Sequence, residues 1–266
     1  MGIPDYTLLD TPEISSRMFQ LDSDGIPSSF GRWEPLPEGA SSHVVNAAGV
    51  ALACRLFPSK ESSSSILFFH GNGEVVSDYN NIYPHIYPRG ISLFAAEYRG
   101  YGASYGTPTY STMISDAHHV YRYFIESLKQ ESGGDKIFVM GRSLGAAAAL
   151  ELAAYYQDDL DGVIIESGSA GMNGWDRWFR GSDELAKLRN LQGNHRDKLK
   201  SISIPLLTIH GDNDAVVPLE RAFELHDMVA SEVKVLDIIP NVGHNTIFLY
   251  GMETYMQSLE SFINKV

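Results

Sequence analysis

A serine bracketed by glycines is the residue of this sequence best suited to covalent chemistry. Ser143 lies in Gly-Arg-Ser-Leu-Gly at 141–145, which follows the apolar run 136–140 and precedes an alanine-rich stretch that begins at Ala146. A sharp turn between a strand and a helix would hold such a serine in a strained backbone conformation, with the glycines relieving the crowding. We therefore interpret Ser143 as a nucleophile, although a glycine-rich turn with a capping serine has a similar sequence.

One histidine stands in a position suited to a general base. A serine hydroxyl is a weak nucleophile and needs such a base, which in turn needs an orienting carboxylate. His244 lies behind a glycine in the loop after the apolar run 233–239, whereas His118 and His119 fall inside a predicted helix. We therefore predict that His244 accepts the proton of the Ser143 hydroxyl.

The orienting acid has more than one candidate. Asp212 and Asp214 share the loop after the apolar run 206–211, and the order serine, aspartate, histidine along the chain is the order of the nucleophile-elbow architecture. Spacing alone does not separate the two, and either could instead form a turn by bonding its own backbone. Glu166, which ends the run 162–167, is a third candidate.

A glycine-rich loop at 70–74, His-Gly-Asn-Gly-Glu, follows another apolar run. Acyl transfer passes through a tetrahedral oxyanion, and each backbone N–H aimed at that oxyanion is worth ~10²–10³ in rate. We expect one donor from Leu144, next to the serine, and the other from Asn72, with His70 bracing the loop. A phosphate-binding loop is a poorer interpretation, because the spacing is not GxGxxG and no Lys-Ser or Lys-Thr pair follows.

The elements that must position these loops are short apolar runs alternating with helical patterns. The runs lie at 66–70, 92–98, 136–140, 162–167, 206–211 and 233–239. They lack polar alternation, which is typical of strands covered on both faces. Apolar residues recur at helical spacing over 113–128 and 248–262, and the segment 44–57, broken at Gly49, reads as an antiparallel pair. We predict an α/β fold with a mainly parallel central sheet and helices on both faces.

The composition and net charge of the chain exclude several classes of function. The 266 residues are 44% hydrophobic and carry a net charge of -13, which predicts a folded domain and argues against nucleic acid as a partner. No apolar run approaches the ~20 residues of a membrane span. The single Cys54 allows no internal disulfide, and no ligand spacing suggests a metal or other cofactor. The first 20 residues lack a signal-peptide pattern, so we expect a soluble, cytoplasmic protein.

Five segments together resemble the α/β-hydrolase superfamily. They are HGNGE at 70–74, EYRGYGASYGTPT at 97–109, GRSLG at 141–145, IHGDNDAVVP at 209–218 and VGHN at 242–245. The chain is most similar to small serine esterases and lipase-like hydrolases with a short cap, a group that includes the serine aminopeptidase-like proteins. The resemblance implies the α/β-hydrolase fold with a triad of Ser143, Asp214 and His244. It also implies an oxyanion hole formed by the N–H groups of Asn72 and Leu144, and acyl transfer to water without a metal or cofactor.

The resemblance covers about residues 43–266, and residues 1–42 form an N-terminal extension to which it assigns no role. The segment at about 170–204 occupies the place of the cap. Its Trp175, Trp178 and Phe179 either line a pocket for an acyl group or form the interior of a small cap helix.

A cap this short predicts a small-molecule ester with a short or medium acyl group as the substrate. Two alternatives are a peptidase, amide or thioester hydrolase on the same triad, and a non-catalytic ligand-binding protein on the same fold.

Overall fold

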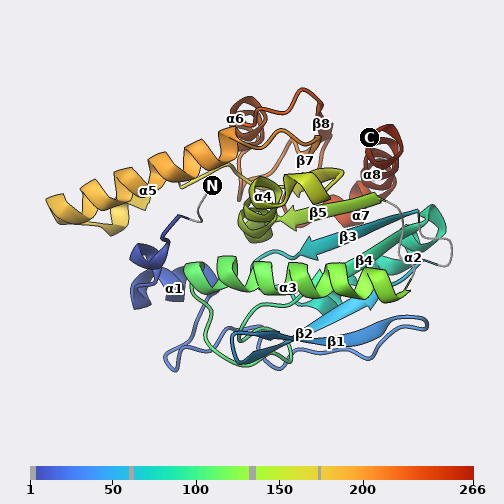
Figure 1. Cartoon of the computed structure of the whole chain (residues 1–266), viewed down its shortest axis with the longest axis horizontal. Helices are drawn as coiled ribbons and strands as arrows, with labels where there is room; N and C mark the ends of the chain where they lie inside the picture. The colour runs from blue at the N-terminus through green and yellow to red at the C-terminus, as the bar shows by residue number, and fades with distance from the viewer. Residues whose placement is uncertain (1–3, 60–62, 132–135, 173–174) are drawn as a thin grey trace.

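An eight-stranded sheet forms the centre of the molecule (Figure 1). The structure is a computed structural model that describes residues 4–59, 63–131, 136–172 and 175–266. The strands are Ser41–Ala47 (β1), Val50–Phe57 (β2), Ser64–Phe69 (β3), Ile91–Ala96 (β4), Lys136–Arg142 (β5), Gly162–Glu166 (β6), Leu206–Gly211 (β7) and Lys234–Ile239 (β8). Their order across the sheet is β1-β2-β4-β3-β5-β6-β7-β8. Strand β2 is antiparallel to both neighbours, and the pairs from β4 to β8 are parallel.

This sheet confirms the mainly parallel arrangement predicted from the apolar runs. Each run supplies one parallel strand, and the segment 44–57 forms the antiparallel β1 and β2. The chain reverses between those two strands through Ala48 and Gly49, whose φ angles are 50° and 86°. Because parallel strands end at the same edge of a sheet, the loops after β3, β5, β7 and β8 meet at one end of the molecule.

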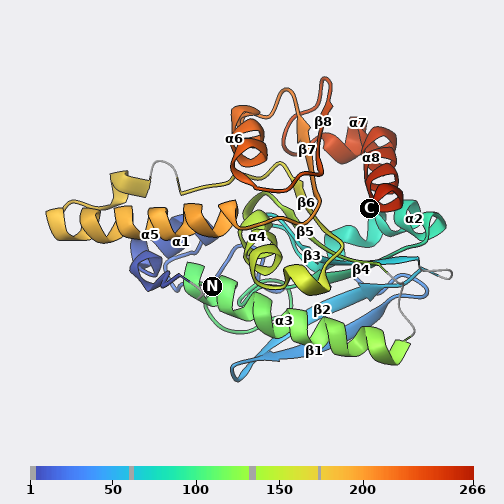
Figure 2. The same cartoon turned by 45° about the horizontal axis from the view of Figure 1, so that its top comes forward.

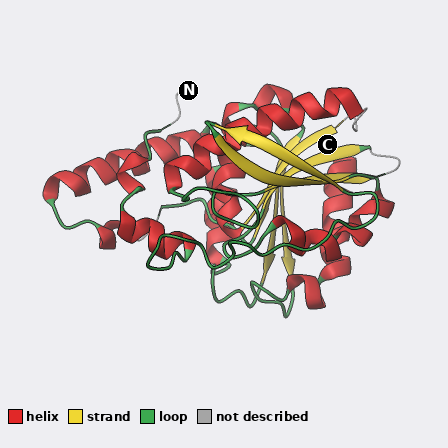
Figure 3. Cartoon of the chain, turned by 90° about the horizontal axis from the view of Figure 1, so that it is seen from below, coloured by secondary structure: helices red, strands yellow, loops and turns green. Residues whose placement is uncertain are grey.

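Helices cover both faces of the sheet (Figure 3). The helices are Pro12–Phe19 (α1), Tyr83–Ile86 (α2), Tyr110–Glu131 (α3), Ala146–Tyr155 (α4), Ser182–Lys200 (α5), Glu220–Met228 (α6), Ile247–Tyr250 (α7) and Met252–Lys265 (α8). Two single turns, Ser143–Gly145 (η4) and Trp175–Trp178 (η6), lie near the loops of interest. The pattern 248–262 is split between α7 and α8 at Gly251, where a Cβ would lie 2.8 Å from the Ile239 side chain.

Each face of the sheet has its own apolar core. Helices α3, α4 and α6 bury Phe124, Leu150 and Leu225 on one face, and α2 and α8 bury Ile86 and Met256 on the other. Complete burial of such a side chain stabilises the fold by about 1.5–3 kcal/mol. Helix α5, between β6 and β7 in the chain, projects away from the sheet beside α1 (Figures 1 and 2). No helix in the described ranges is long and apolar enough to cross a membrane.

The N-terminal segment packs into the same core as the helices of the α4 face. Its buried apolar side chains are Tyr6, Leu9, Ile14 and Phe19. Thr11 caps α1 by accepting the N–H of Ile14 at 3.3 Å, and Pro12 occupies the first helical position. Asp10 accepts the N–H of Ser111 at the start of α3, at 3.0 Å. The described part of the extension is therefore fixed against the rest of the fold.

The start of α4 lies unusually close to the sheet. A Cβ placed on Gly145 would come 2.1 Å from the carbonyl oxygen of Phe69, at the end of β3. A Cβ placed on Gly141 would come 2.3 Å from the carbonyl oxygen of Gly145 itself. The small residues of the motif are therefore required by the approach of helix and strand, which presents the turn between them at the edge of the sheet.

We expect Gly145→Ala to lower the free energy of unfolding by about 1–3 kcal/mol, because backbone atoms of β3 would have to move. The matched control is Gly193→Ala in α5, where nothing lies within 4 Å of the added Cβ. That control should be neutral or stabilise the protein by up to about 1 kcal/mol. Urea denaturation followed by circular dichroism measures both, and an unchanged midpoint for Gly145→Ala would contradict the close approach.

Candidate active site

Ser143 occupies a strained turn between β5 and α4. Its φ angle is 50°, in the left-handed region that residues with a Cβ rarely adopt. The strand ends at Arg142, one turn of η4 follows, and α4 begins at Ala146. This is the sharp junction predicted from the sequence, and it leaves the Ser143 side chain half-buried at the edge of the sheet.

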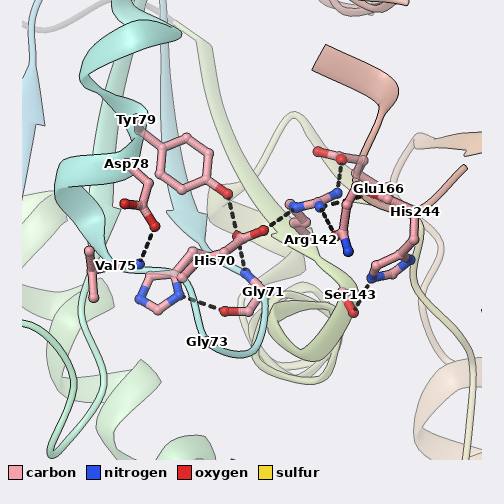
Figure 4. Close-up of polar contacts among 12 residues, drawn as sticks. His70, Gly71, Gly73, Val75, Asp78, Tyr79, Arg142, Ser143, Glu166 and His244 are labelled. Carbon is pink, nitrogen blue, oxygen red and sulfur yellow. Dashed lines mark hydrogen bonds and ion pairs between the residues drawn. The ribbon is translucent and has the colours of Figure 1, made fainter. Parts of the chain in front are cut away.

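The loops after β5, β7 and β8 bring a serine, an aspartate and a histidine together. The Nε2 atom of His244 lies 3.0 Å from Oγ of Ser143 (Figure 4). Its Nδ1 atom lies 2.7 Å from Oδ2 of Asp214. An ionised Asp214 accepts the Nδ1–H, which leaves Nε2 free to accept the proton of the serine hydroxyl. The arrangement therefore has the geometry of a nucleophile, its general base and an orienting acid.

Asp214 is the acid that the structure brings to the histidine. Its side chain is buried, and its Oδ1 accepts the N–H groups of Val216 at 2.9 Å and Val217 at 2.8 Å. Burial raises the pKa of Asp214, but the hydrogen bonds from His244 and these amides outweigh it and hold that pKa below its ordinary value. The carboxylate is therefore ionised at neutral pH.

The other two candidate acids lie elsewhere. Asp212 is exposed and accepts the N–H of Asn241 at 2.7 Å, so it braces the turn. Glu166 is completely buried and forms an ion pair with Arg142. Spacing left Asp212 and Asp214 as alternatives, and the structure distinguishes them because Asp214 contacts His244 whereas Asp212 contacts Asn241.

A cavity of about 480 Å³ lies over the serine. Its polar lining includes Ser143, His244, Asn72, Ser169 and Asn245, and its apolar lining includes Leu144, Leu150, Tyr110, Val216 and Trp175. Both predicted oxyanion donors, Asn72 and Leu144, are therefore in the wall of the cavity that contains the serine. Among the described residues, no group of three or more histidines, cysteines, aspartates or glutamates could hold a metal ion.

The three aromatic residues predicted in the cap lie in different places. Trp175 lines the cavity over Ser143. Trp178 lines a neighbouring cavity instead. Phe179 is 7% exposed, belongs to the apolar core and lines neither cavity. The two interpretations of this segment therefore apply to different residues, with Trp175 facing the cavity and Phe179 filling the interior.

The N-terminal segment contributes to the site, which the sequence analysis missed. Met18 and Gln20 line the cavity. The Nδ2 of Asn72 donates to the carbonyl oxygen of Met18 at 2.7 Å, and the Tyr101 hydroxyl donates to Oδ1 of Asn72 at 2.7 Å. The signal available was the Thr-Pro-Glu start of a helix at 11–13, which predicts an ordered element but not its partner.

Arg142, the residue before the serine, connects two loops of the site and the end of β6 (Figure 4). Its Nε donates to Glu74 at 2.7 Å, and its Nη1 donates to Glu166. Its Nη2 donates to the carbonyl oxygen of His244 at 3.0 Å and to Oδ1 of Asn245 at 3.2 Å. One guanidinium next to the serine therefore holds the glycine-rich loop and the histidine loop.

The charges around this guanidinium compensate one another. Burial lowers the pKa of Arg142, but Glu166 and Glu74 outweigh it and raise that pKa well above its ordinary value. Burial raises the pKa of Glu74, yet Arg142 holds the net pKa below its ordinary value. Glu166 differs, because its complete burial outweighs Arg142 and leaves its pKa raised. A charged arginine and an ionised Glu74 therefore face each other at neutral pH.

Two acidic side chains brace the glycine-rich loop. Oε2 of Glu74 accepts the N–H of Gly71 and the hydroxyl of Tyr79, both at 2.7 Å. His70 is fully buried, with Nε2 2.5 Å from Glu97 and Nδ1 2.9 Å from the carbonyl oxygen of Gly71. The structure therefore places His70 in a bracing position, as expected from the sequence.

Known proteins resemble this chain in sequence. Residues 60–181 match a family model described as Serine aminopeptidase, S33 (Hydrolase_4). The α/β-hydrolase domain-containing protein aho-3 of Caenorhabditis elegans is 27% identical over 226 residues, which cover 80% of this chain and 61% of that protein. The lysophosphatidylserine lipase ABHD12 of Xenopus tropicalis is 26% identical over 223 residues, which cover 74% of this chain and 57% of that protein. The chain thus spans about three fifths of these two relatives.

Solved structures share the fold at lower sequence identity. A soluble variant of monoglyceride lipase from Saccharomyces cerevisiae superposes with a TM-score of 0.71 at 15% identity, over 89% of this chain and 98% of that one. The Est1E protein of Butyrivibrio proteoclasticus, with ferulic acid bound, has a TM-score of 0.70 at 19% identity, over 84% of this chain and 98% of that one. The sheet order, the family model and these relatives agree. The chain has the α/β-hydrolase fold and is similar in sequence to α/β-hydrolase proteins.

Proposed function

We propose that this protein is a serine hydrolase that cleaves carboxylic esters with short or medium acyl groups. The observation that carries the proposal is the hydrogen-bonded series in which Nε2 of His244 lies 3.0 Å from Ser143 Oγ while its Nδ1 lies 2.7 Å from Asp214. Similarity to proteins named as lipases supports an ester substrate. A cavity of about 480 Å³ is in the size range of small-molecule sites.

The reaction follows from the roles of these groups. Ser143 Oγ attacks the ester carbonyl carbon while His244 Nε2 takes the hydroxyl proton, and the N–H groups of Asn72 and Leu144 stabilise the oxyanion. The bond to the alcohol oxygen then breaks, and His244 returns the proton to the leaving alcohol. Water, deprotonated by His244, then attacks the acyl carbon; the bond from that carbon to Ser143 Oγ breaks, His244 returns the proton to Oγ, and the acid is released. Asp214 holds the ring and stabilises the imidazolium throughout.

Amide and thioester substrates would pass through the same steps, and the family model's description as an aminopeptidase favours an amide as the second candidate. A peptidase would have to bind and protonate an amine leaving group in the same cavity. A cytoplasmic location stays a prediction from the sequence.

Ser143 is the nucleophile of this proposal. We expect the protein to hydrolyse p-nitrophenyl esters of two- to eight-carbon acids, and Ser143→Ala to lower kcat/KM by about 10³-fold or more. Ser115→Ala is the matched control, because Ser115 lies exposed on α3 and donates to the carbonyl oxygen of Thr112. It should keep the activity of the unaltered protein.

Two results would contradict this function. No turnover of any ester in the series would remove the ester assignment, and undiminished turnover by Ser143→Ala would remove the nucleophile. Faster turnover of aminoacyl p-nitroanilides than of the esters would favour the peptidase.

Asp214 and Asp212 lie in the same loop, but Asp214 contacts His244 and Asp212 does not. Asp214→Asn leaves the ring of His244 without a carboxylate partner, so we expect kcat/KM to fall by about 10³–10⁴-fold. Asp212→Asn changes the same charge at an exposed site that contacts Asn241, and should alter kcat/KM by less than about threefold. Equal losses in the two variants would show that Asp214 has no special role.

The lowered pKa of Asp214 also predicts that the stability of the fold depends on pH. The pKa of Asp214 in the folded protein lies below its ordinary value of 3.8, so its carboxylate stabilises the fold above pH 3.8. That contribution is lost as the pH falls through the lower value. We therefore expect Asp214→Asn to melt below the unaltered protein at pH 7, with the gap closing below about pH 4. A gap in Tm that is constant from pH 7 to pH 3 would contradict the lowered pKa.

A further inference from the structure

A second cavity of about 640 Å³ adjoins the one over the serine. Met18 of α1 and Trp175 of η6 line both cavities. The second cavity is thus bounded by the N-terminal helix on one side and by the segment before α5 on the other. A ligand that reaches Ser143 and extends past Met18 and Trp175 enters this second space.

The lining of the second cavity is basic. Arg17, Arg177 and Arg180 line it, and Glu13 is the one carboxylate among the described residues of its lining. Three positive charges and one negative charge give it a formal charge of +2, in a chain whose net charge is -13. An overall negative protein repels anions at long range, so a local reversal of charge beside the active site selects for an anionic ligand that binds there.

Two of these guanidinium groups contact an aromatic ring, and none has a carboxylate within 3.5 Å among the described residues. The Trp178 ring lies against two of them, with Arg17 Cζ 4.6 Å and Arg177 Cζ 5.3 Å from its centroid. Stacking on a ring face leaves the N–H groups of a guanidinium free to bond at its edge. Arg17 contacts Glu13 only at 3.8 Å, with both side chains 67% exposed. Within the part of the chain that the structure describes, Arg177 and Arg180 form no ion pair with a carboxylate.

Buried polar contacts join the N-terminal segment to α4 and α5, outside the lining of the second cavity. Lys198 Nζ of α5 donates to the Tyr6 hydroxyl at 2.7 Å and to Glu151 of α4 at 2.6 Å. The Tyr6 hydroxyl lies 3.1 Å from Nδ1 of His195. Burial, with Lys198 nearby, lowers the pKa of His195 to about 4, so its neutral ring accepts the Tyr6 proton. These contacts hold the N-terminal segment against α4 and α5, and the contact of Arg17 with the Trp178 ring joins the two walls of the cavity.

We propose that this second cavity binds a carboxylate or phosphate group carried by the substrate at the end remote from the scissile ester. The inference rests on the proposed function, because it places the reacting carbonyl at Ser143. It defines the substrate class as an acyl ester with an anionic remote end, connected by a short apolar stretch that passes Met18 and Trp175. Arg177 and Arg180 bind the anion, since guanidinium groups match both carboxylate and phosphate geometry.

The test compares matched neutral and anionic esters. One pair is p-nitrophenyl hexanoate and mono-p-nitrophenyl adipate, which place the anion on the acyl side. The other pair is butyryl glycerol and butyryl glycerol 3-phosphate, which place it on the alcohol side. We expect kcat/KM to favour the anionic member of at least one pair by about tenfold, and the preference to shrink at high salt. The pair that responds identifies the side and the type of anion.

Two double variants distinguish an effect of the second cavity from an effect of the protein's overall charge. Arg177→Gln/Arg180→Gln should abolish the preference while leaving kcat/KM for the neutral esters unchanged. Arg189→Gln/Arg196→Gln removes the same charge from exposed positions of α5 that line neither cavity, and should keep the preference.

Different results would contradict the anion site and the proposed ester hydrolysis. Turnover of neutral esters without any preference for the anionic members, or equal preferences in both double variants, would overturn the inference alone. If none of the four esters is hydrolysed, the proposal of an ester hydrolase is overturned, and the inference with it.

Discussion

The buried guanidinium of Arg142 is the group on which the geometry of the site depends. A cation removed from water must be compensated by charge and hydrogen bonds, and removing one partner of a buried pair costs about 3–5 kcal/mol. Here the compensation comes from Glu74 after β3, Glu166 at the end of β6 and the carbonyl oxygen of His244 after β8. Satisfying one side chain therefore fixes the relative positions of two loops and a strand end that are distant in the chain.

Two structural constraints together place the serine and the histidine. The close approach of α4 to β3 allows only glycine at 145 and leaves Ser143 in a left-handed conformation at the sheet edge. Arg142, the residue before it, draws in the histidine loop, so that His244 lies within hydrogen-bonding distance of the serine. The N-terminal segment lines the cavity through Met18 and Gln20 and holds Asn72 by its side chain.

The limits of prediction from the sequence follow from the same contacts. The apolar runs and the serine motif specify local structure, so the sheet and the strained turn were predictable. The choice between Asp212 and Asp214 depends on which side chain points inward, which spacing does not encode. The partners of Arg142 lie 68, 24 and 102 positions away, and Met18 meets Asn72 across 54 positions. Contacts at such separations depend on which loops the completed fold brings together, so they could not be read from the sequence alone.

The rate at which a fluorophosphonate labels Ser143 tests this dependence most directly. Arg142→Lys keeps the charge but lacks the planar fork that reaches Glu74, Glu166 and His244 together. With circular dichroism showing the fold retained and mass spectrometry locating the label, we expect the second-order rate constant to fall about 10²-fold, as for a small misplacement of reacting groups. The dependence of the site on Arg142 would be contradicted if Arg142→Lys were labelled at the rate of the unaltered protein. The role of Ser143 would be contradicted if the unaltered protein were labelled at another residue.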